Sequence, residues 1–171
     1  MRRTLSILAA VVIAGAGLLA GTGGTAAADT VTPTQSRIDA ILEKHADATQ
    51  TGKEIITFSD GVQLRLGAAA TGPCPQESLC FWEHDHFGGE LLSYPGPLCR
   101  SGTLFNFDDR GFNDRASSWQ NNSPSFAWYA EVFADYGGGG TRLWEMLPSL
   151  DGPGLPKRYN DAASSMYCEP F

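Results

Sequence analysis

Long hydrophobic runs are scarce in this 171-residue chain. A single one extends from Leu5 to Ala20, consists of apolar or small residues apart from Ser6, and falls short of the roughly 20 residues that a membrane-spanning helix needs. It follows the basic start Met1-Arg2-Arg3 and precedes Ala26-Ala27-Ala28. Because a basic segment, an apolar segment and an A-x-A site make a secretory signal peptide, we expect residues 1–28 to be removed and the protein to be secreted.

Positive charge is also scarce. Beyond residue 28, ten Lys and Arg face 19 Asp and Glu, which gives a net charge of −9. Binding to phosphate backbones or anionic membranes depends on clustered Lys and Arg. The composition therefore excludes nucleic-acid and membrane partners.

Catalytic motifs are missing. The chain has three histidines, no H-E-x-x-H and no G-x-S-x-G. Asp108 and Asp109 are adjacent, so they cannot flank a glycosidic bond as the two carboxylates of a glycosidase do. We expect a protein that is not an enzyme.

Cysteines are few, and all four follow the expected signal peptide. An even number in an exported chain predicts two disulfides. A four-thiolate metal site would need paired C-x2-C spacing, which the chain lacks. The spacing leaves all three pairings open among Cys74, Cys80, Cys99 and Cys168.

Residues 29–71 form a leader in which we expect a helix and a β-hairpin. Within Asp29–Thr51, Thr32 and Pro33 are the N-cap and N1 residues of a helix start, with Gln35 at the capping-box position. The β-prone runs 54–58 and 62–66 flank Ser-Asp-Gly, and an Asp-Gly turn between such runs indicates a hairpin.

Residues 72–171 have the composition of an all-β domain. Aromatic residues and glycines are dense, no helical period persists, and short β-prone runs alternate with turn residues, as in a sandwich or barrel. The strands that we expect are Leu79–His84, Glu90–Tyr94, Ser117–Asn121, Ala127–Phe133, Thr141–Glu145 and Ser164–Cys168.

The same region contains an internal repeat. Trp82–Gly89 is followed by Asn113-Asp-Arg-Ala-Ser-Ser118, and Glu131–Gly138 is followed by Asn160-Asp-Ala-Ala-Ser-Ser165. The two copies lie 47 to 49 residues apart and keep both parts in the same order. Such a period indicates two related structural units.

These motifs resemble the βγ-crystallin Greek key, which has an aromatic-x4-aromatic-x-Gly hairpin and a clamp of the form [N/D][N/D]xx[S/T]S. The first copy fits completely, whereas the second has Glu131 in place of the first aromatic residue. The segment Cys74–Phe81, which leads into the first motif, also resembles the Streptomyces-type metalloproteinase-inhibitor family. The resemblance implies an all-β fold, a two-Greek-key βγ-crystallin-like sandwich preceded by a short helix and a β-hairpin.

The resemblance further implies a secreted, monomeric inhibitor whose partner is an extracellular protease, most readily a metalloproteinase. By analogy with the closely spaced first cysteine pair of that family, we expect Cys74–Cys80, which leaves Cys99–Cys168. A rigid exposed loop can occlude an active site without an ordering penalty. The disulfide-closed loop meets this need, with Glu77 as the carboxylate that faces zinc, and its inhibitory residues would be Pro75, Gln76, Glu77 and Ser78.

The two clamps are candidate Ca²⁺ sites, because Ca²⁺ takes six to eight oxygen ligands. Carried over from βγ-crystallins, the ligands come from Asn113, Asp114, the Arg115 carbonyl and Ser117, and from Asn160, Asp161, the Ala162 carbonyl and Ser164. The alternative is that these side chains only cap turns and bond across the fold. A second function therefore stays open, that of a Ca²⁺-binding extracellular module with a structural or antimicrobial role.

Overall fold

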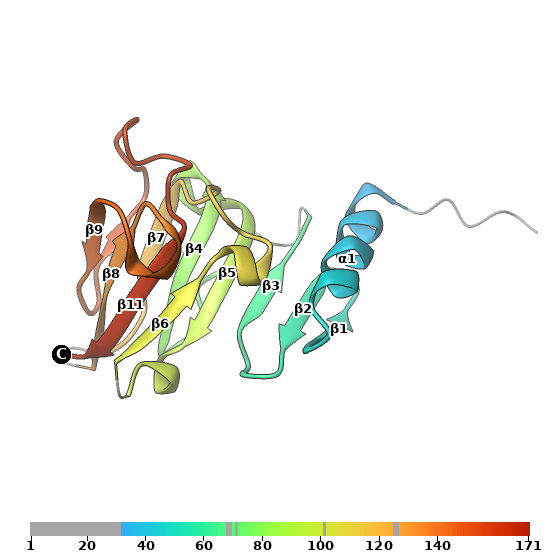
Figure 1. Cartoon of the computed structure of the whole chain (residues 1–171), viewed down its shortest axis with the longest axis horizontal. Coiled ribbons are helices and arrows are strands. Elements are labelled where there is room, and N and C mark those ends of the chain that lie inside the picture. The colour runs from blue at the N-terminus through green and yellow to red at the C-terminus, as the bar shows by residue number, and fades with distance from the viewer. Residues whose placement is uncertain (1–31, 68–69, 71, 101, 125–126) are drawn as a thin grey trace, which may run out of the picture. The chain divides into compact units, whose positions relative to one another are not determined.

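A computed structural model of the chain describes residues 32–67, 70, 72–100, 102–124 and 127–171 (Figure 1). The expected signal peptide, residues 1–28, lies outside the described residues. Within them, no helix is both long and apolar enough to cross a membrane.

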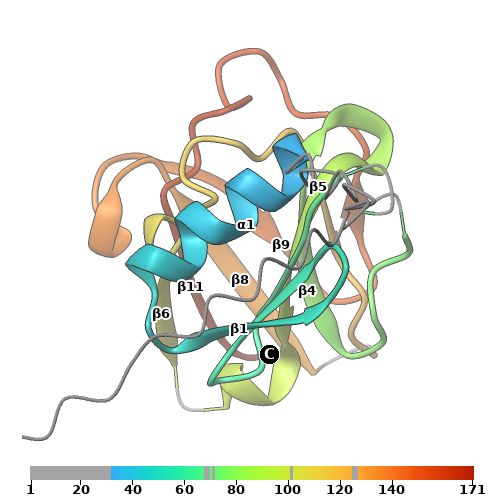
Figure 2. The ribbon, with the colours of Figure 1, turned by 90° about the vertical axis from the view of Figure 1, so that its right-hand side faces the viewer.

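The helix expected in the leader is α1 (Pro33–Lys44), and it starts at the predicted cap. The side-chain oxygen of Thr32 accepts a hydrogen bond from the backbone N–H of Gln35 at 3.2 Å, which satisfies one of the unpaired donors of the first turn. Ile38 and Ile41 are buried on one face. Figure 2 looks onto this helix, with β1 (Ala48–Gly52) beside it.

The expected hairpin is formed by β2 (Ile55–Phe58) and β3 (Gln63–Arg65), which pair antiparallel. Strand β1 corrects the expectation that Asp29–Thr51 contains only a helix, because it pairs antiparallel with β2. Its threonines favour extended backbone, and the hydroxyls of Thr51 and Thr57 are hydrogen-bonded at 2.8 Å.

The remaining strands are divided between two sheets. They are β4 (Ser78–His84), β5 (Gly88–Pro95), β6 (Thr103–Asn106), β7 (Ser118–Asn121), β8 (Trp128–Phe133), β9 (Arg142–Met146), β10 (Asp151–Gly152) and β11 (Ser165–Pro170). All six expected strands are present within one or two residues at their ends. Short 3-10 helices connect them: η2 (Asp85–Phe87), η3 (Gly96–Cys99), η4 (Asp108–Arg110) and η5 (Tyr136–Gly138).

The strand order is that of two Greek keys that exchange a strand. One sheet has the order β1-β2-β3-β5-β4-β7-β10 and the other β6-β11-β8-β9 (Figure 1). The third strand of the first copy, β6, pairs with β11 of the second copy, and β10 of the second copy pairs with β7 of the first. The predicted two-Greek-key sandwich is confirmed by this topology.

The leader extends the first sheet, because β3 pairs with β5. Its side chains also enter the core between the sheets: Ile38, Ile56 and Leu64 are completely buried in the same cluster as Phe81 and Phe107. The leader and residues 72–171 thus share one hydrophobic core.

Two disulfides close the structure, with the pairing expected from the resemblance. Cys74–Cys80 spans six positions within one loop, and Cys99–Cys168 joins η3 to β11 across 69 positions. The second bond therefore ties the first copy of the repeat to the second.

Candidate functional site

The two clamps face each other across the fold. The Ser117 hydroxyl donates to Asp161 Oδ1 at 3.3 Å, and the Ser164 hydroxyl donates to Asp114 Oδ1 at 3.1 Å. Both aspartates have a φ of +52°, in the left-handed region that Asp and Asn tolerate best among residues other than Gly. Each clamp therefore brings its first serine to the carboxylate of the other clamp.

The other polar groups of the clamps hold the two turns in place. Asn113 and Asn160 donate their side-chain amides to the neighbouring Asp114 and Asp161 at 2.8 and 2.7 Å. The backbone N–H groups of the same aspartates donate to carbonyls of the opposite clamp. The asparagines and aspartates of the clamps thus also hold the turns in place.

The second serine of each clamp has a structural role. Ser118 donates to the His84 carbonyl and accepts from the backbone of Phe87, and Ser165 makes the equivalent bonds to Asp135 and Gly138. Both hairpins are fastened in the same way, with Asp135 in the place of His84 and Gly138 in the place of Phe87. The position of Trp82 is therefore taken by Phe133 and not by Glu131, which corrects the expected alignment of the second copy by two residues.

The second hairpin packs differently, because Gly138 stands where the first hairpin has Phe87. In the first copy Trp82 and Phe87 are in edge contact, with ring centroids 5.1 Å apart. In the second copy Tyr136 has the place of Asp85 at the start of the turn and is 62% exposed, and Glu131 pairs with Arg142.

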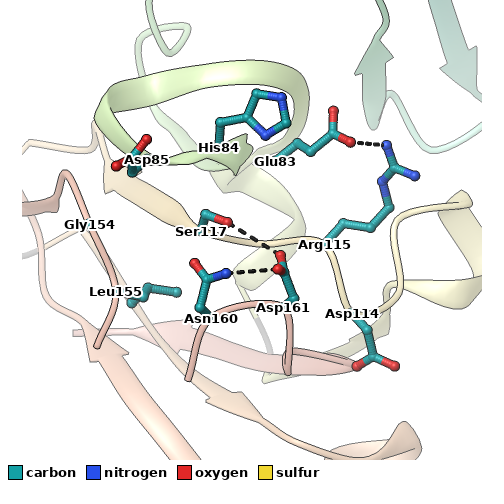
Figure 3. A pocket seen from close by; sticks show the side chains of 10 residues that line it. All are labelled: Glu83, His84, Asp85, Asp114, Arg115, Ser117, Gly154, Leu155, Asn160 and Asp161. Atoms are coloured by element: carbon teal, nitrogen blue, oxygen red, sulfur yellow. Dashed lines mark hydrogen bonds and ion pairs between the residues drawn. The ribbon is translucent and has the colours of Figure 1, made fainter. Parts of the chain in front are cut away.

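A cleft of about 570 Å³ is lined by residues of both clamps (Figure 3). Its lining includes the carboxylates of Glu83, Asp85, Asp114 and Asp161 and one cation, Arg115. The guanidinium of Arg115 is turned toward Glu83, with Nη2 2.5 Å from Oε1 (Figure 3). Its charge is therefore paired with that carboxylate.

The clamps offer few oxygen ligands for a cation. Each clamp offers a hydroxyl, a carboxylate from the other clamp and the carbonyls of its own turn, all oxygens that suit Ca²⁺. Nowhere in the described ranges do three His, Cys, Asp or Glu side chains gather as a metal-binding group. Water molecules would have to complete a coordination shell of six to eight oxygens.

The loop closed by Cys74–Cys80 is held by a second restraint that the sequence did not reveal. The Asn122 side chain donates to the Cys74 carbonyl at 2.9 Å and to the Pro75 carbonyl at 3.2 Å. Its backbone carbonyl accepts from Glu77 N, and its N–H donates to the Ser78 carbonyl, both at 2.9 Å. Asn122 thus makes hydrogen bonds to four residues of this loop, Cys74, Pro75, Glu77 and Ser78.

The tip of the loop is small and fixed. Gln76 and Glu77 are exposed, whereas Ser78 is buried. Glu77 has a φ of +55°, and its carbonyl accepts a hydrogen bond of 2.7 Å from Gly96 N. The four residues predicted as inhibitory are therefore brought together, with Gln76 and Glu77 presented to solvent.

A buried ion-pair network joins the leader to the clamp region. Arg37 in α1 makes two hydrogen bonds to the Glu90 carboxylate, at 2.6 and 2.7 Å, and one to the Gly111 carbonyl. Arg115 approaches the same carboxylate at 3.1 Å and also pairs with Glu83. Because the Glu90 side chain is only 10% exposed, both of its cationic partners are needed to offset its desolvation.

Part of the chain matches the model of a protein family, and several solved structures have a similar fold. Residues 67–143 match the model of peptidase inhibitor family I36, which confirms the resemblance to a metalloproteinase-inhibitor family. The comparison with curated proteins gave no match. A match to an inhibitor family supports a role as a proteinase inhibitor and implies a protein that is not an enzyme.

The similar solved structures are βγ-crystallin domains. One, from a study of the evolution of the eye lens βγ-crystallin domain fold, is 23% identical, covers 65% of this chain and 99% of its own, and has a TM-score of 0.49. A double mutant of a Clostridium beijerinckii domain is 21% identical, with 55% and 98% coverage and a TM-score of 0.43. A βγ-crystallin from Ciona intestinalis is 25% identical, with 55% and 99% coverage and a TM-score of 0.39.

Proposed function

From the match of residues 67–143 to peptidase inhibitor family I36, we propose that this protein inhibits an extracellular metalloproteinase by placing the loop Pro75–Ser78 in its active site. The observation that carries the proposal is the double restraint of this loop, by the Cys74–Cys80 disulfide and by Asn122. Two disulfides also support an exported location, because they persist in oxidising compartments.

The restraint explains how such a loop would resist cleavage. A protease must draw the chain into an extended form to cut it, but the backbone N–H and carbonyl of Glu77 are already bonded to Asn122 and Gly96. The left-handed φ of Glu77 also differs from extended backbone. A preformed loop pays little entropy on binding, so occlusion requires no chemistry.

Glu77 supplies the group that would reach the enzyme's metal. A catalytic zinc keeps one coordination position open, and a carboxylate oxygen can fill it. Glu77 is exposed at the tip, in the part of the loop that no core residue covers.

The test is inhibition of a thermolysin-like enzyme by the mature chain and by Glu77→Gln. The substitution removes the charge and keeps the shape, so we expect the inhibition constant to rise about tenfold, equivalent to roughly 1.4 kcal/mol. Glu43→Gln is the matched control, since Glu43 is exposed in α1. Glu90 would be a poor control, because its carboxylate is buried between Arg37 and Arg115. No inhibition at micromolar protein, or digestion of the wild type, contradicts the proposal.

A second candidate function, a Ca²⁺-binding module, is favoured by the reciprocal contacts between the clamps. Ser117 with Asp161, and Ser164 with Asp114, place hydroxyl and carboxylate oxygens 3.3 and 3.1 Å apart. Two hard oxygens at this separation can both contact one Ca²⁺. We propose that each pair, with the carbonyl of Arg115 or Ala162, holds the ion when it binds.

Melting temperatures with Ca²⁺ and with a chelator test this candidate. A ligand at 100 times its dissociation constant stabilises the fold by roughly 2.7 kcal/mol. Asp114→Asn with Asp161→Asn should abolish the increase, because Asn tolerates the same left-handed φ and lacks the charge. Asp108→Asn with Asp109→Asn removes two exposed carboxylates elsewhere and should leave the Ca²⁺ response intact. An equal response in both variants excludes the clamps as the site.

A further inference from the structure

The turn between β9 and β10 exposes two leucines beside the loop Pro75–Ser78. Leu147 is 37% and Leu150 51% exposed. Five large apolar side chains are exposed among the described residues, and two of them lie in this one turn. Exposed apolar side chains that cluster usually mark a contact surface.

A cleft of about 370 Å³ connects the turn to the loop. It is lined by Gln76 and Glu77 from the loop, by the segment 122–124, and by Ser149 from the turn. The tip residues of the loop and the turn that carries the leucines therefore border the same hollow.

The turn is as firmly held as the loop. Ser149 has a φ of +60°, and its hydroxyl donates to the Ser123 carbonyl at 2.9 Å. Leu150 N donates to the Leu147 carbonyl at 3.2 Å, and the Leu150 carbonyl accepts from Asn121 N at 2.9 Å. The neighbouring residue, Asn122, fastens the inhibitory loop, so both segments are positioned by the end of β7.

We propose that Leu147 and Leu150 form a second contact point for the same protease, on an apolar surface next to its active-site cleft. This inference rests on the proposed function. A specific protein–protein interface covers about 800 Å² on each partner, far more than a two-residue tip provides. A few residues near the centre of an interface carry most of its affinity, and burial of the two exposed leucines next to Glu77 would add a hydrophobic contribution there.

The experiment compares inhibition by the wild type, Glu77→Gln, and Leu147→Asn with Leu150→Asn. We expect the leucine double variant to raise the inhibition constant at least tenfold with an unchanged melting temperature, because both side chains are exposed. The matched control is Leu104→Asn with Tyr136→Asn, which removes the exposed apolar pair of β6 and η5. Neither residue belongs to the turn between β9 and β10 or to the segments that line the cleft, so the control should inhibit like the wild type.

The outcomes separate the two proposals. If Glu77→Gln weakens inhibition and the leucine variant does not, the second contact point is wrong and the inhibitory loop stands. If the wild type inhibits no metalloproteinase, both proposals fail. If the leucine variant instead converts a dimer to a monomer in sedimentation experiments, the turn serves self-association, and the proposed contact with the protease is overturned.

Discussion

At the scale of single residues, Asn122 matters most for the loop that we propose as inhibitory. Its amide and backbone make four hydrogen bonds to Cys74, Pro75, Glu77 and Ser78. A disulfide fixes only the two ends of a loop, whereas Asn122 fixes carbonyls and an N–H between them. The rigidity that inhibition requires therefore depends on a residue 42 to 48 positions away in the sequence.

We predict that Asn122→Ala weakens inhibition more than it weakens the fold. Two loop carbonyls lose a neutral donor, which should lower the free energy of unfolding by about 1–2 kcal/mol, while the loop gains freedom and becomes a better substrate. Inhibition constants and mass spectrometry of the protein after incubation with the enzyme measure both effects. Gln120→Ala, two residues earlier in β7, is the control. Equal inhibition by both variants would show that Asn122 does not position the loop.

Through Tyr129, we expect the free energy of unfolding to depend on pH in the alkaline range. Its hydroxyl donates to the Glu169 carboxylate, and this hydrogen bond is the main cause that raises the pKa of Tyr129 to about 12, from 10.0. Because the folded pKa lies above the unfolded one, the stabilisation is complete below pH 10 and is lost as the pH rises through about 12. We predict a free energy of unfolding that falls over this range, and a smaller fall in Tyr129→Phe. Urea denaturation at several pH values measures it, and identical slopes in the two proteins would refute it.

At the scale of elements, local sequence signals predicted the helix and the hairpin that form through local interactions. The cap at Thr32 and the Asp-Gly turn define α1 and the β2–β3 hairpin through contacts a few residues apart. Strands β6 and β10, which pair with strands from the other copy of the repeat, were missed, and β6 has only four residues. Strand β10 has only two residues, too few for any periodic pattern.

The leader strands are part of the core rather than an appendage, and Ile56 tests this. Its side chain is completely buried among residues of both sheets. We predict that Ile56→Ala lowers the free energy of unfolding by about 2–5 kcal/mol in a single cooperative transition. Thr49→Ala, at an exposed position of β1, should have little effect. Two separate transitions in the wild type would show instead that the leader unfolds by itself.

At the scale of the whole molecule, the internal repeat predicted the architecture better than it predicted the inhibitory site. Because the clamps recur in equivalent places, their approach across the fold follows from the sequence pattern, and the structure places Ser117 against Asp161. The support of the inhibitory loop has no such signature. Asn122 lies outside both clamps and reaches Cys74 only because β7 is paired with β4.

If the loop Pro75–Ser78 is the inhibitory site, we predict that one disulfide mainly stabilises the fold and the other mainly supports inhibition. In the chain-entropy model, Cys99–Cys168, which spans 69 positions, contributes about 4 kcal/mol, and Cys74–Cys80, which spans six, contributes about 2 kcal/mol. Replacing Cys99 and Cys168 by Ala should lower the melting temperature strongly, while inhibition persists below that temperature, because the inhibitory loop is untouched.

Replacing Cys74 and Cys80 by Ala should have the reverse effect. The melting temperature falls less, but inhibition is lost, because the loop keeps only the hydrogen bonds from Asn122 and Gly96. Calorimetry and inhibition assays on the two double variants give the comparison. Retained inhibition without the Cys74–Cys80 bond would move the inhibitory surface away from this loop, since no other covalent restraint acts on Gln76 and Glu77.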